Sequence, residues 1–307
     1  MSDNSMYGAR VILDSIGPNG ARLTTLEVTH PRMVHADFMT HRMFSRNASS
    51  SRAIPVDALL EKIERAPVMP VWWGKNQSGM QAASELEGDA LEEAKRLWIE
   101  GRDYNVSLAR RFKRIGLHKQ LANRVVEPWM FITCVLTVTE IDNYFGLRID
   151  AGAQPELDFP AKCARDALAA SQPRELRSGE WHLPYVTGYD EAELRARGFG
   201  DDRLRSVAVG RCAAVSYLKQ DSSQEAVDDE RRAMERLYPS GHWSPFEHIA
   251  QAMTTDEWRI YGAKLSRRWV EERVPVGNFW GWRQWRKELD DEHNFKRLTE
   301  KRKARTA

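Results

Sequence analysis

The sequence predicts a mixed α/β protein, and three parts of its 307 residues carry that prediction. Residues 10–16 and 21–30 flank the turn GPNG and are typical of short strands. Residues 82–115 place Leu, Ala and Trp at helical spacing among many charges, which predicts a long amphipathic helix that could break near Gly101. Residues 129–145 are apolar and β-branched, and their period alone predicts either a buried strand or a buried helix.

Shorter elements follow from spacing and from turn residues. Helices are expected over 55–66, with Pro55 in the first turn, and over 160–171, 206–218 and 223–237. Residues 67–81 are expected to form a loop and residues 172–192 a connection between segments. The chain end from Arg286 is dense in charge, so we expect it to be solvated.

Composition places the chain among globular proteins and argues against two classes of partner. Hydrophobic residues make up 42% and charged residues 29%, as in a soluble domain. A formal net charge of +2 gives no general attraction to nucleic acid or to membranes, so neither partner is expected. The N-terminus has no signal-peptide run and no window is apolar enough to span a membrane, which predicts a cytoplasmic protein.

Cysteine and tryptophan usage leaves one question open. Cys134, Cys163 and Cys212 are far apart and form no CxxC pair, which predicts thiols buried in a reducing compartment rather than a zinc site. Eleven Trp are unusual, and six of them fall in the last quarter of the chain. We expect them to pack in the core, with stacking platforms for planar ligands as the alternative.

The stretch THRMFSRNASSSRAIP, from Thr40 to Pro55, combines cations and hydroxyls with almost nothing to bury; we call it the basic-serine stretch. Its three Arg supply planar donors that suit phosphate oxygens, and its four Ser supply hydroxyl groups. The alternative is a Ser-rich surface loop with incidental Arg. The stretch contains neither a Walker motif nor GxGxxG, so a P-loop or classical dinucleotide fold is not supported.

Two further clusters carry polar side chains at the ends of apolar segments. In LRIDAGAQPE, Arg148 could reach into a cleft and stabilise negative charge, or could cap carbonyls at the end of a buried element. In SGHWSPFEH, the His and Glu spacing fits no zinc template, so a metal site is not expected. Ser244 is expected to cap a helix that begins at Pro245, with Glu247 completing a capping box.

Together these clusters resemble the sequence blocks of the flavin-dependent (alternative) thymidylate synthases. The family signature is Arg-His-Arg, seven residues and Ser, with Asn-Glu inside it and Arg two positions later; the matching residues here are Thr40, His41, Arg42, Asn47, Ala48, Ser50 and Arg52. A second block matches Arg148 and Ala153–Glu156, and a third matches CAAVSY (Cys212–Tyr217) and HWSPFEH (His242–His248). The third block usually comes first, so the chain resembles a permuted member of the phage and actinobacterial type.

The resemblance implies a fold and an activity. The family has a mixed α/β fold with long helices packed on a mixed sheet, and it works as a homotetramer with sites shared between subunits. It methylates C5 of dUMP, taking the carbon from methylenetetrahydrofolate and the hydride from reduced FAD, which NADPH re-reduces. The resemblance thus implies one catalytic domain over 1–307, in which 1–180 carries the basic-serine stretch and Arg148 and 181–307 carries the Ser-Pro-Phe-Glu-His block and the Trp-rich tail.

The resemblance also implies a role for each matching residue. Arg148 would be the catalytic residue that holds the uracil and stabilises charge as C5 becomes nucleophilic. The nucleotide contacts would be Ser49, Ser50, Ser51, Arg52 and Arg124, together with Arg148. The FAD contacts would be His41, Arg42, Asn143, Ser244 and His248. No cysteine nucleophile is expected, because the three Cys stand apart from any activating groups.

Three departures from the family pattern keep alternatives open. Thr40 replaces the first signature Arg, Ala48 replaces the signature Glu, and Gly152 stands where His is common. Changed partners at a pyrimidine can change preference by orders of magnitude, so dCMP could replace dUMP and a hydroxymethyl product could replace a methyl one. An inactive paralogue is a further alternative. A different class, a single-stranded nucleic-acid-binding protein, would use NFWGWRQWRKEL, Asn278–Leu289, although near-neutral charge argues against it.

Overall fold

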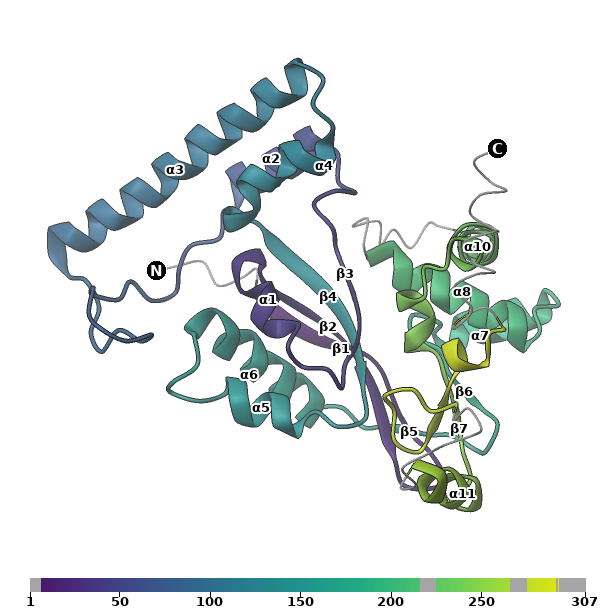
Figure 1. Ribbon diagram of the computed structural model, residues 1–307. Coiled ribbons are helices and arrows are strands. Elements are labelled where there is room, and N and C mark those ends of the chain that lie inside the picture. The colour runs from purple at the N-terminus through teal and green to yellow at the C-terminus, as the bar shows by residue number, and fades with distance from the viewer. Residues whose placement is uncertain (1–6, 216–224, 266–274, 291, 293–307) are drawn as a thin grey trace.

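The computed structural model describes residues 7–215, 225–265, 275–290 and 292, and it has the mixed α/β architecture that the sequence predicts (Figure 1). A five-stranded sheet and a three-stranded sheet form its framework. All strands of the larger sheet precede residue 180 and all strands of the smaller sheet follow it. The division into two halves, 1–180 and 181–307, stays a prediction.

The five-stranded sheet begins with the expected hairpin. Strands β1 (Gly8–Ile16) and β2 (Arg22–Pro31) pair antiparallel across the GPNG turn, which confirms both predicted strands. β4 (Phe131–Val138) and β3 (Ser45–Ala48) extend the sheet antiparallel, while β5 (Arg174–Glu175) adds to β1 in parallel. The order β3-β4-β2-β1-β5 makes the sheet mixed, as expected.

The apolar run 129–145 forms the buried strand of its two alternatives, followed by the start of a helix that is mostly exposed. Its first part is β4, whose residues are nearly all buried, and its last part enters α5 (Asp142–Arg148). α6 (Pro155–Ala169) begins earlier than predicted and packs on β1 and β2. A hydrophobic core lies between the sheet and these helices, with Leu26, Leu136 and Leu157 fully buried.

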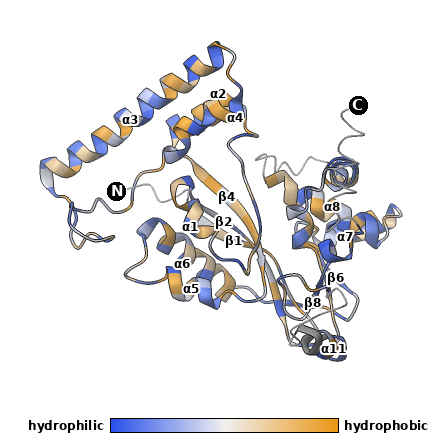
Figure 2. Cartoon of the chain, viewed as in Figure 1, coloured by the Kyte–Doolittle hydropathy of each residue, from blue (hydrophilic) through white to orange (hydrophobic). Residues whose placement is uncertain are grey.

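A second layer of helices extends away from the sheet. α2 (Val56–Arg65) follows Pro55, which stands one residue before the helix rather than in its first turn. α3 (Gly88–Arg114) starts six residues later than the predicted 82 and runs unbroken through Gly101. Gly101 lets Trp129 approach the helix closely, since an added Cβ would lie 3.2 Å from the Trp129 ring. Hydrophilic residues are spread along most of α3, as expected of an amphipathic helix (Figure 2).

Two pairs of short helices connect this layer back to the sheet. η2 (Arg32–Val34) and α1 (His35–Phe38) follow β2, and α4 (Lys119–Ala122) leads into η3 (Asn123–Trp129), which ends directly before β4. η2 contacts η3. This contact brings the residues after β2 next to those before β4.

The second half is helical around the small sheet. That sheet holds β6 (Trp181–His182), β7 (Ala250–Ala252) and β8 (Trp282–Gln284). The helices are α7 (Gly188–Ala196), α8 (Asp201–Ala214), α9 (Ala226–Arg231), η5 (Arg232–Leu237), α10 (Tyr238–Ser240), η6 (Ser244–His248), α11 (Thr255–Leu265) and η7 (Trp285–Glu288). No helix in the described residues is long and apolar enough to cross a bilayer.

Several predictions for this half need correction. Residues 172–192 are not only a connection, because they contain β5, β6 and the start of α7. The helix predicted over 206–218 begins at Asp201 and its regular part ends at Ala214, while residues 216–218 lie outside the described part. Ser244 makes no capping hydrogen bond, since η6 begins at Ser244 itself. Glu247 pairs with Arg286 instead of completing a capping box.

The tryptophans of the second half pack mostly as core. Trp243, Trp282 and Trp285 are buried, which confirms the packing interpretation for these three. Trp258 and Trp280 contact each other edge to face, and Trp280 is 46% exposed. Trp269 and the charged end beyond residue 292 lie outside the described residues.

A chain of buried side-chain hydrogen bonds ties the two halves together. His248 Nδ1 bonds Thr137 Oγ1 at 2.8 Å, Thr137 bonds Thr25 Oγ1 at 2.7 Å, and Thr25 bonds His182 Nε2 at 2.8 Å. His182 Nδ1 bonds Ser15 Oγ at 2.9 Å. Thr25 and Thr137 face each other on β2 and β4, whereas the two His come from the second half.

Close packing of α8 against α9 gives the first testable prediction. A Cβ at Gly210 would lie 2.2 Å from the Asp229 carbonyl oxygen, which is backbone and cannot rotate away. We expect Gly210→Ala to lower the free energy of unfolding by about 3 kcal/mol in urea titrations. The control is Gly146→Ala on α5, where a Cβ would meet nothing within 4 Å; it should be neutral or stabilising. Equal stability of the two variants would contradict this packing.

The buried histidine chain gives a pH prediction. Burial lowers the pKa of His182 from 6.5 to about 3, so the unfolded chain takes up a proton that the folded chain refuses as pH falls below 6.5. Folding stability should therefore fall with pH in this window, and the His182 contribution at pH 5.5 should be about 1.4 kcal/mol. Urea unfolding at pH 7.5 and 5.5 should show a smaller loss for His182→Asn than for wild type. The exposed His242→Asn variant is the control, and an unchanged slope in His182→Asn would refute the assignment.

Candidate functional site

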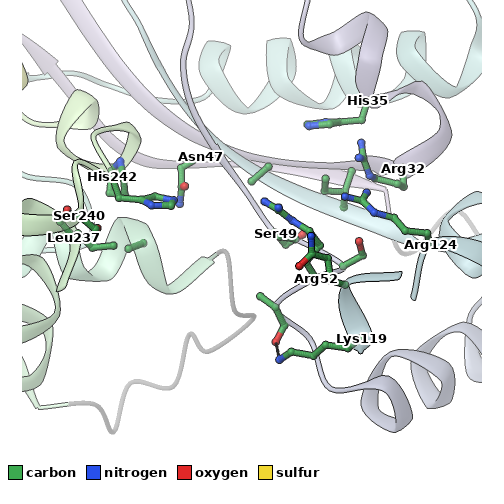
Figure 3. A pocket seen from close by; sticks show the side chains of 18 of the residues that line it. Arg32, His35, Asn47, Ser49, Arg52, Lys119, Arg124, Leu237, Ser240 and His242 are labelled. Atoms are coloured by element: carbon green, nitrogen blue, oxygen red, sulfur yellow. Dashed lines mark hydrogen bonds between the residues drawn. The ribbon is translucent and has the colours of Figure 1, made fainter. Parts of the chain in front are cut away.

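A cavity of about 750 Å³ lies where the end of β3 faces the helices of the second half (Figure 3). It is lined by Arg32, His35, Asn47, Ala48, Ser49, Ser50, Ser51, Arg52, Ala53, His118, Lys119, Gln120, Arg124, Ile132, Ala213, Arg236, Leu237, Ser240, His242 and Pro245. In Figure 3, one wall carries Arg32, Arg52, Lys119 and Arg124, and the facing wall carries Leu237, Ser240 and His242.

The charge of this lining is entirely of one sign. Its cations are Arg32, Arg52, Lys119, Arg124 and Arg236, and none of the lining residues is Asp or Glu. Among the described residues, Arg52 and Arg236 form neither a hydrogen bond nor an ion pair through their side chains. Guanidinium groups that line a cavity without a carboxylate partner favour an anionic ligand, and phosphate matches their geometry.

The serines of the basic-serine stretch enter the cavity wall, but their hydroxyls are not equally available. Ser49 Oγ accepts from the Thr133 backbone N–H at 3.2 Å, and Ser51 Oγ donates to Glu127 Oε1 at 2.6 Å. The Ser50 hydroxyl makes no hydrogen bond within the described part of the chain. Ser50 is therefore the hydroxyl of the three that a ligand can engage without breaking a bond to the protein.

The backbone turn that carries these serines is held by side chains that donate hydrogen bonds to its carbonyl groups. Asn123, which is fully buried, donates from Nδ2 to the carbonyl of Ser51 at 2.7 Å and to that of Ile54 at 3.0 Å. Lys119 Nζ donates to the Ala53 carbonyl at 2.8 Å. These bonds fix the backbone around Arg52, whose own side chain is exposed. The wall is therefore built before a ligand arrives, which lowers the ordering cost of binding.

Glu127 lies behind this wall and contacts three of its members. Its Oε1 accepts from Ser51 and from Arg124 Nη1, both at 2.6 Å, and lies 3.8 Å from Arg32 Nε. The Glu127 side chain is 19% exposed. This carboxylate comes from η3 and was not among the sequence-based candidates.

A neutral histidine pair completes the upper wall. His30 Nε2 and His35 Nδ1 lie 3.1 Å apart, and the two rings stack. Burial lowers the pKa of His30 to about 3 and that of His35 to about 4, so both are neutral at pH 7. His30 Nδ1 is buried without a hydrogen-bond partner. Burying an unprotonated ring nitrogen without a partner costs less than burying a ring N–H without one. We therefore place the His30 proton on Nε2, which makes His35 Nε2–H the free donor of the pair.

Arg148 and His41 meet each other at a second place. Arg148 Nε donates to His41 Nε2 at 2.9 Å, and Nη2 donates to the Asp37 carbonyl at 3.1 Å and to Thr40 Oγ1 at 3.2 Å. Burial together with the charge of Arg148 lowers the pKa of His41 to about 4, which keeps the ring an acceptor. The second sequence cluster is thus joined to the start of the basic-serine stretch, although neither residue lines the cavity.

The other residues assigned to FAD differ in their exposure, and none of them lines the cavity. Arg42 and Asn143 are exposed, Ser244 is half-buried, and His248 is completely buried with its Nδ1 bonded to Thr137. His248 Nε2 has no partner among the described residues, so the ring's only hydrogen bond there is the one from Nδ1 to Thr137. None of the five FAD residues lines the cavity, and their convergence on a flavin stays a prediction.

Several lining residues could not be selected from the sequence. Arg32 and His35 lie in η2 and α1, His118 and Lys119 precede η3, and Arg236 lies in the last turn of η5. None of them belongs to the three clusters. The sequence signal that could have selected them is their residue type alone, since each is a cation or an imidazole. His242, in contrast, belongs to the third block and does reach the cavity. No group of three or more metal-ligand side chains occurs among the described residues.

Comparison with known proteins finds similarity to solved structures, of which two are described below. No family model matches the sequence, and no curated protein matches it. A crystal structure of the UMP/dUMP methylase PolB from Streptomyces cacaoi bound with 5-Br dUMP is 18% identical with a TM-score of 0.40, covering 48% of this chain and 67% of that one. The same methylase bound with 5-Br UMP is 15% identical with a TM-score of 0.40, covering 48% and 68%. A likeness of this size transfers no residue role and no activity to this chain.

The unpaired guanidinium of Arg52 yields a direct prediction for the cavity. Arg52→Ala should weaken binding of inorganic phosphate about tenfold or more, because a charged hydrogen bond is lost without any internal partner being freed. Isothermal titration calorimetry at low salt measures the effect. Arg111→Ala, which removes an exposed Arg of α3 that does not line the cavity, is the matched control. Equal phosphate affinity in both variants would remove Arg52 from the site.

Proposed function

We propose that this chain is a pyrimidine-nucleotide-modifying enzyme of the flavin-dependent thymidylate synthase type, acting at C5 of dUMP. The observation that carries the proposal is the cavity itself. Five residues assigned to the nucleotide from the sequence resemblance, Ser49, Ser50, Ser51, Arg52 and Arg124, all line it, and its lining holds cations without a carboxylate. A phosphate-bearing ligand suits that lining better than a neutral one.

The cavity residues would bind and orient the nucleotide. Arg52 and Ser50 would hold the phosphate, because their donors have no other partner among the described residues. Neutral His35 would donate to a pyrimidine carbonyl without adding a charge. Methylenetetrahydrofolate would supply the carbon, and FAD re-reduced by NADPH would supply the hydride. The cysteines are not suited to replace this chemistry, because burial raises the pKa of Cys134 to about 12 and raises those of Cys163 and Cys212.

Arg148 would act beside the cavity as the stabiliser of charge on the uracil. Its guanidinium is already oriented by His41, Thr40 and the Asp37 carbonyl, so it is held in place before substrate binds. We expect Arg148→Ala to lower product formation at least 100-fold while the melting temperature changes little. The measurement is a turnover assay combined with thermal unfolding, and Arg165→Ala on α6 is the control. Normal turnover by Arg148→Ala would remove the residue from the reaction.

Two departures from the family pattern support a second candidate function. Ala48 lines the cavity, so the signature carboxylate of the family is absent at a position where a ligand would bind. Thr40 accepts from Arg148, so the changed first signature residue touches the proposed catalytic group. We therefore also propose that the pyrimidine could be dCMP, or that the product could carry a hydroxymethyl group.

Product mass after incubation separates these possibilities. The protein is supplied with FAD, NADPH and methylenetetrahydrofolate, and with dUMP and dCMP in parallel reactions. Methylated dUMP is the expected result, while a modified dCMP or a hydroxymethyl product would establish the second candidate. No product from either nucleotide, together with a colourless protein that fails to bind FAD, would contradict the proposal and favour an inactive paralogue.

A further inference from the structure

The cations of the cavity differ in whether the protein already neutralises them. Arg52 and Arg236 have no carboxylate partner among the described residues, and they come from different halves of the chain. Arg124 forms an ion pair with Glu127 at 2.6 Å, and Arg32 lies within 3.8 Å of the same oxygen. Glu127 therefore compensates one end of the cavity wall and leaves the other end open.

The position of Glu127 is fixed by more than one contact. Its Oε1 also accepts from the Ser51 hydroxyl at 2.6 Å, so the carboxylate is tied to the basic-serine stretch as well as to η3. Its charge also reaches the cavity lining, since it opposes the lowering of the His35 pKa that burial and two arginines cause. In the described part of the chain, Oε2 makes no hydrogen bond, so only one of the two carboxylate oxygens is engaged by the protein.

We propose that Glu127 is a specificity-determining residue that restricts the cavity to phosphate monoesters and disfavours di- and triphosphates. This inference rests on the proposed binding of a nucleotide in the cavity, but it concerns the number of phosphates and not the chemistry at the pyrimidine. Each added phosphate brings further negative charge, and each of those charges meets the repulsion of Glu127 as well as the attraction of the cations. A monophosphate can bind through the cations that have no carboxylate partner, above all Arg52.

The absence of a carboxylate at Ala48 strengthens this assignment. In the family that the sequence resembles, the signature stretch itself carries a Glu at that position. Here the position is Ala48, in the cavity wall, and the carboxylate nearest to the serine hydroxyls comes instead from Glu127 through its bond to Ser51. The carboxylate beside the serine hydroxyls therefore belongs to η3 and not to β3, and it pairs with Arg124.

The test compares inorganic phosphate, pyrophosphate and tripolyphosphate as probes for the full-length protein. Glu127→Gln keeps the size of the side chain and an oxygen for Ser51, but removes the charge. Isothermal titration calorimetry at low salt should show the ratio of tripolyphosphate affinity to phosphate affinity rising on the order of tenfold. Glu127→Asp, which keeps the charge, should leave the ratio near that of wild type.

A matched control tests whether any loss of a Glu–Arg pair has this effect. Glu64 pairs with Arg110 at 2.7 Å between α2 and α3, outside the cavity lining, and Glu64→Gln should not change the ratio. An unchanged ratio in Glu127→Gln would overturn the inference, as would an equal rise in Glu127→Asp or Glu64→Gln. Failure of the wild-type protein to bind any of the three anions would overturn it as well.

These outcomes are distinct from failure of the proposed function, because the probes contain no pyrimidine and the assay needs no flavin. A protein that shows the expected shift in ratio but yields no modified nucleotide would retain this inference and lose the proposed reaction. A protein that modifies dUMP without the shift would retain the reaction and lose the role of Glu127.

Discussion

The arrangement of the whole molecule depends on a pair of threonines at the centre of the larger sheet. Thr25 and Thr137 are both completely buried, and each uses its hydroxyl to bond the other and a histidine of the second half. A buried polar group without a partner costs about 1–3 kcal/mol, so these hydroxyls strongly favour the one docking that satisfies them. That docking places η6 and the end of η5 opposite β3, and the cavity is the space left between them. The site is therefore a consequence of how the halves join.

A second polar network supports the same junction from the Trp-rich segment. Gln284 Nε2 lies within 3.1 Å of Ser45 Oγ and within 3.0 Å of Asn278 Oδ1, and Asn278 Nδ2 donates to the Met43 carbonyl at 2.8 Å. The residues between the buried Trp thus hold the beginning of the basic-serine stretch in place. This role explains why Asn and Gln stand among aromatic residues there, and it needs no nucleic-acid partner.

Local patterns predicted what local interactions determine. The hairpin β1–β2 and the amphipathic α3 follow from turn chemistry and period, and both are observed. Whether the run 129–145 forms a strand or a helix could not be predicted, because a buried strand and a buried helix share the same apolar composition. The basic-serine stretch does lie in a cavity, but the opposing Arg236 could not be assigned, since only the docking of two distant halves brings it near Arg52. Glu127 was missed because its partners Ser51 and Arg32 are far from it in sequence, although all three belong to the first half.

The charge pattern also links ligand binding to the stability of this docking. Arg52 belongs to the first half and Arg236 to the second, and both lack a carboxylate partner among the described residues. With like charges on facing walls, the cavity without an anion weakens the junction by repulsion. An anion held between the walls removes that repulsion and binds only the docked arrangement, so it stabilises the docked halves by mass action. Without a bound anion, the buried threonine–histidine chain has to hold the halves together against the repulsion between the cavity cations. A bound anion adds an attraction between the two walls that these cations alone do not provide.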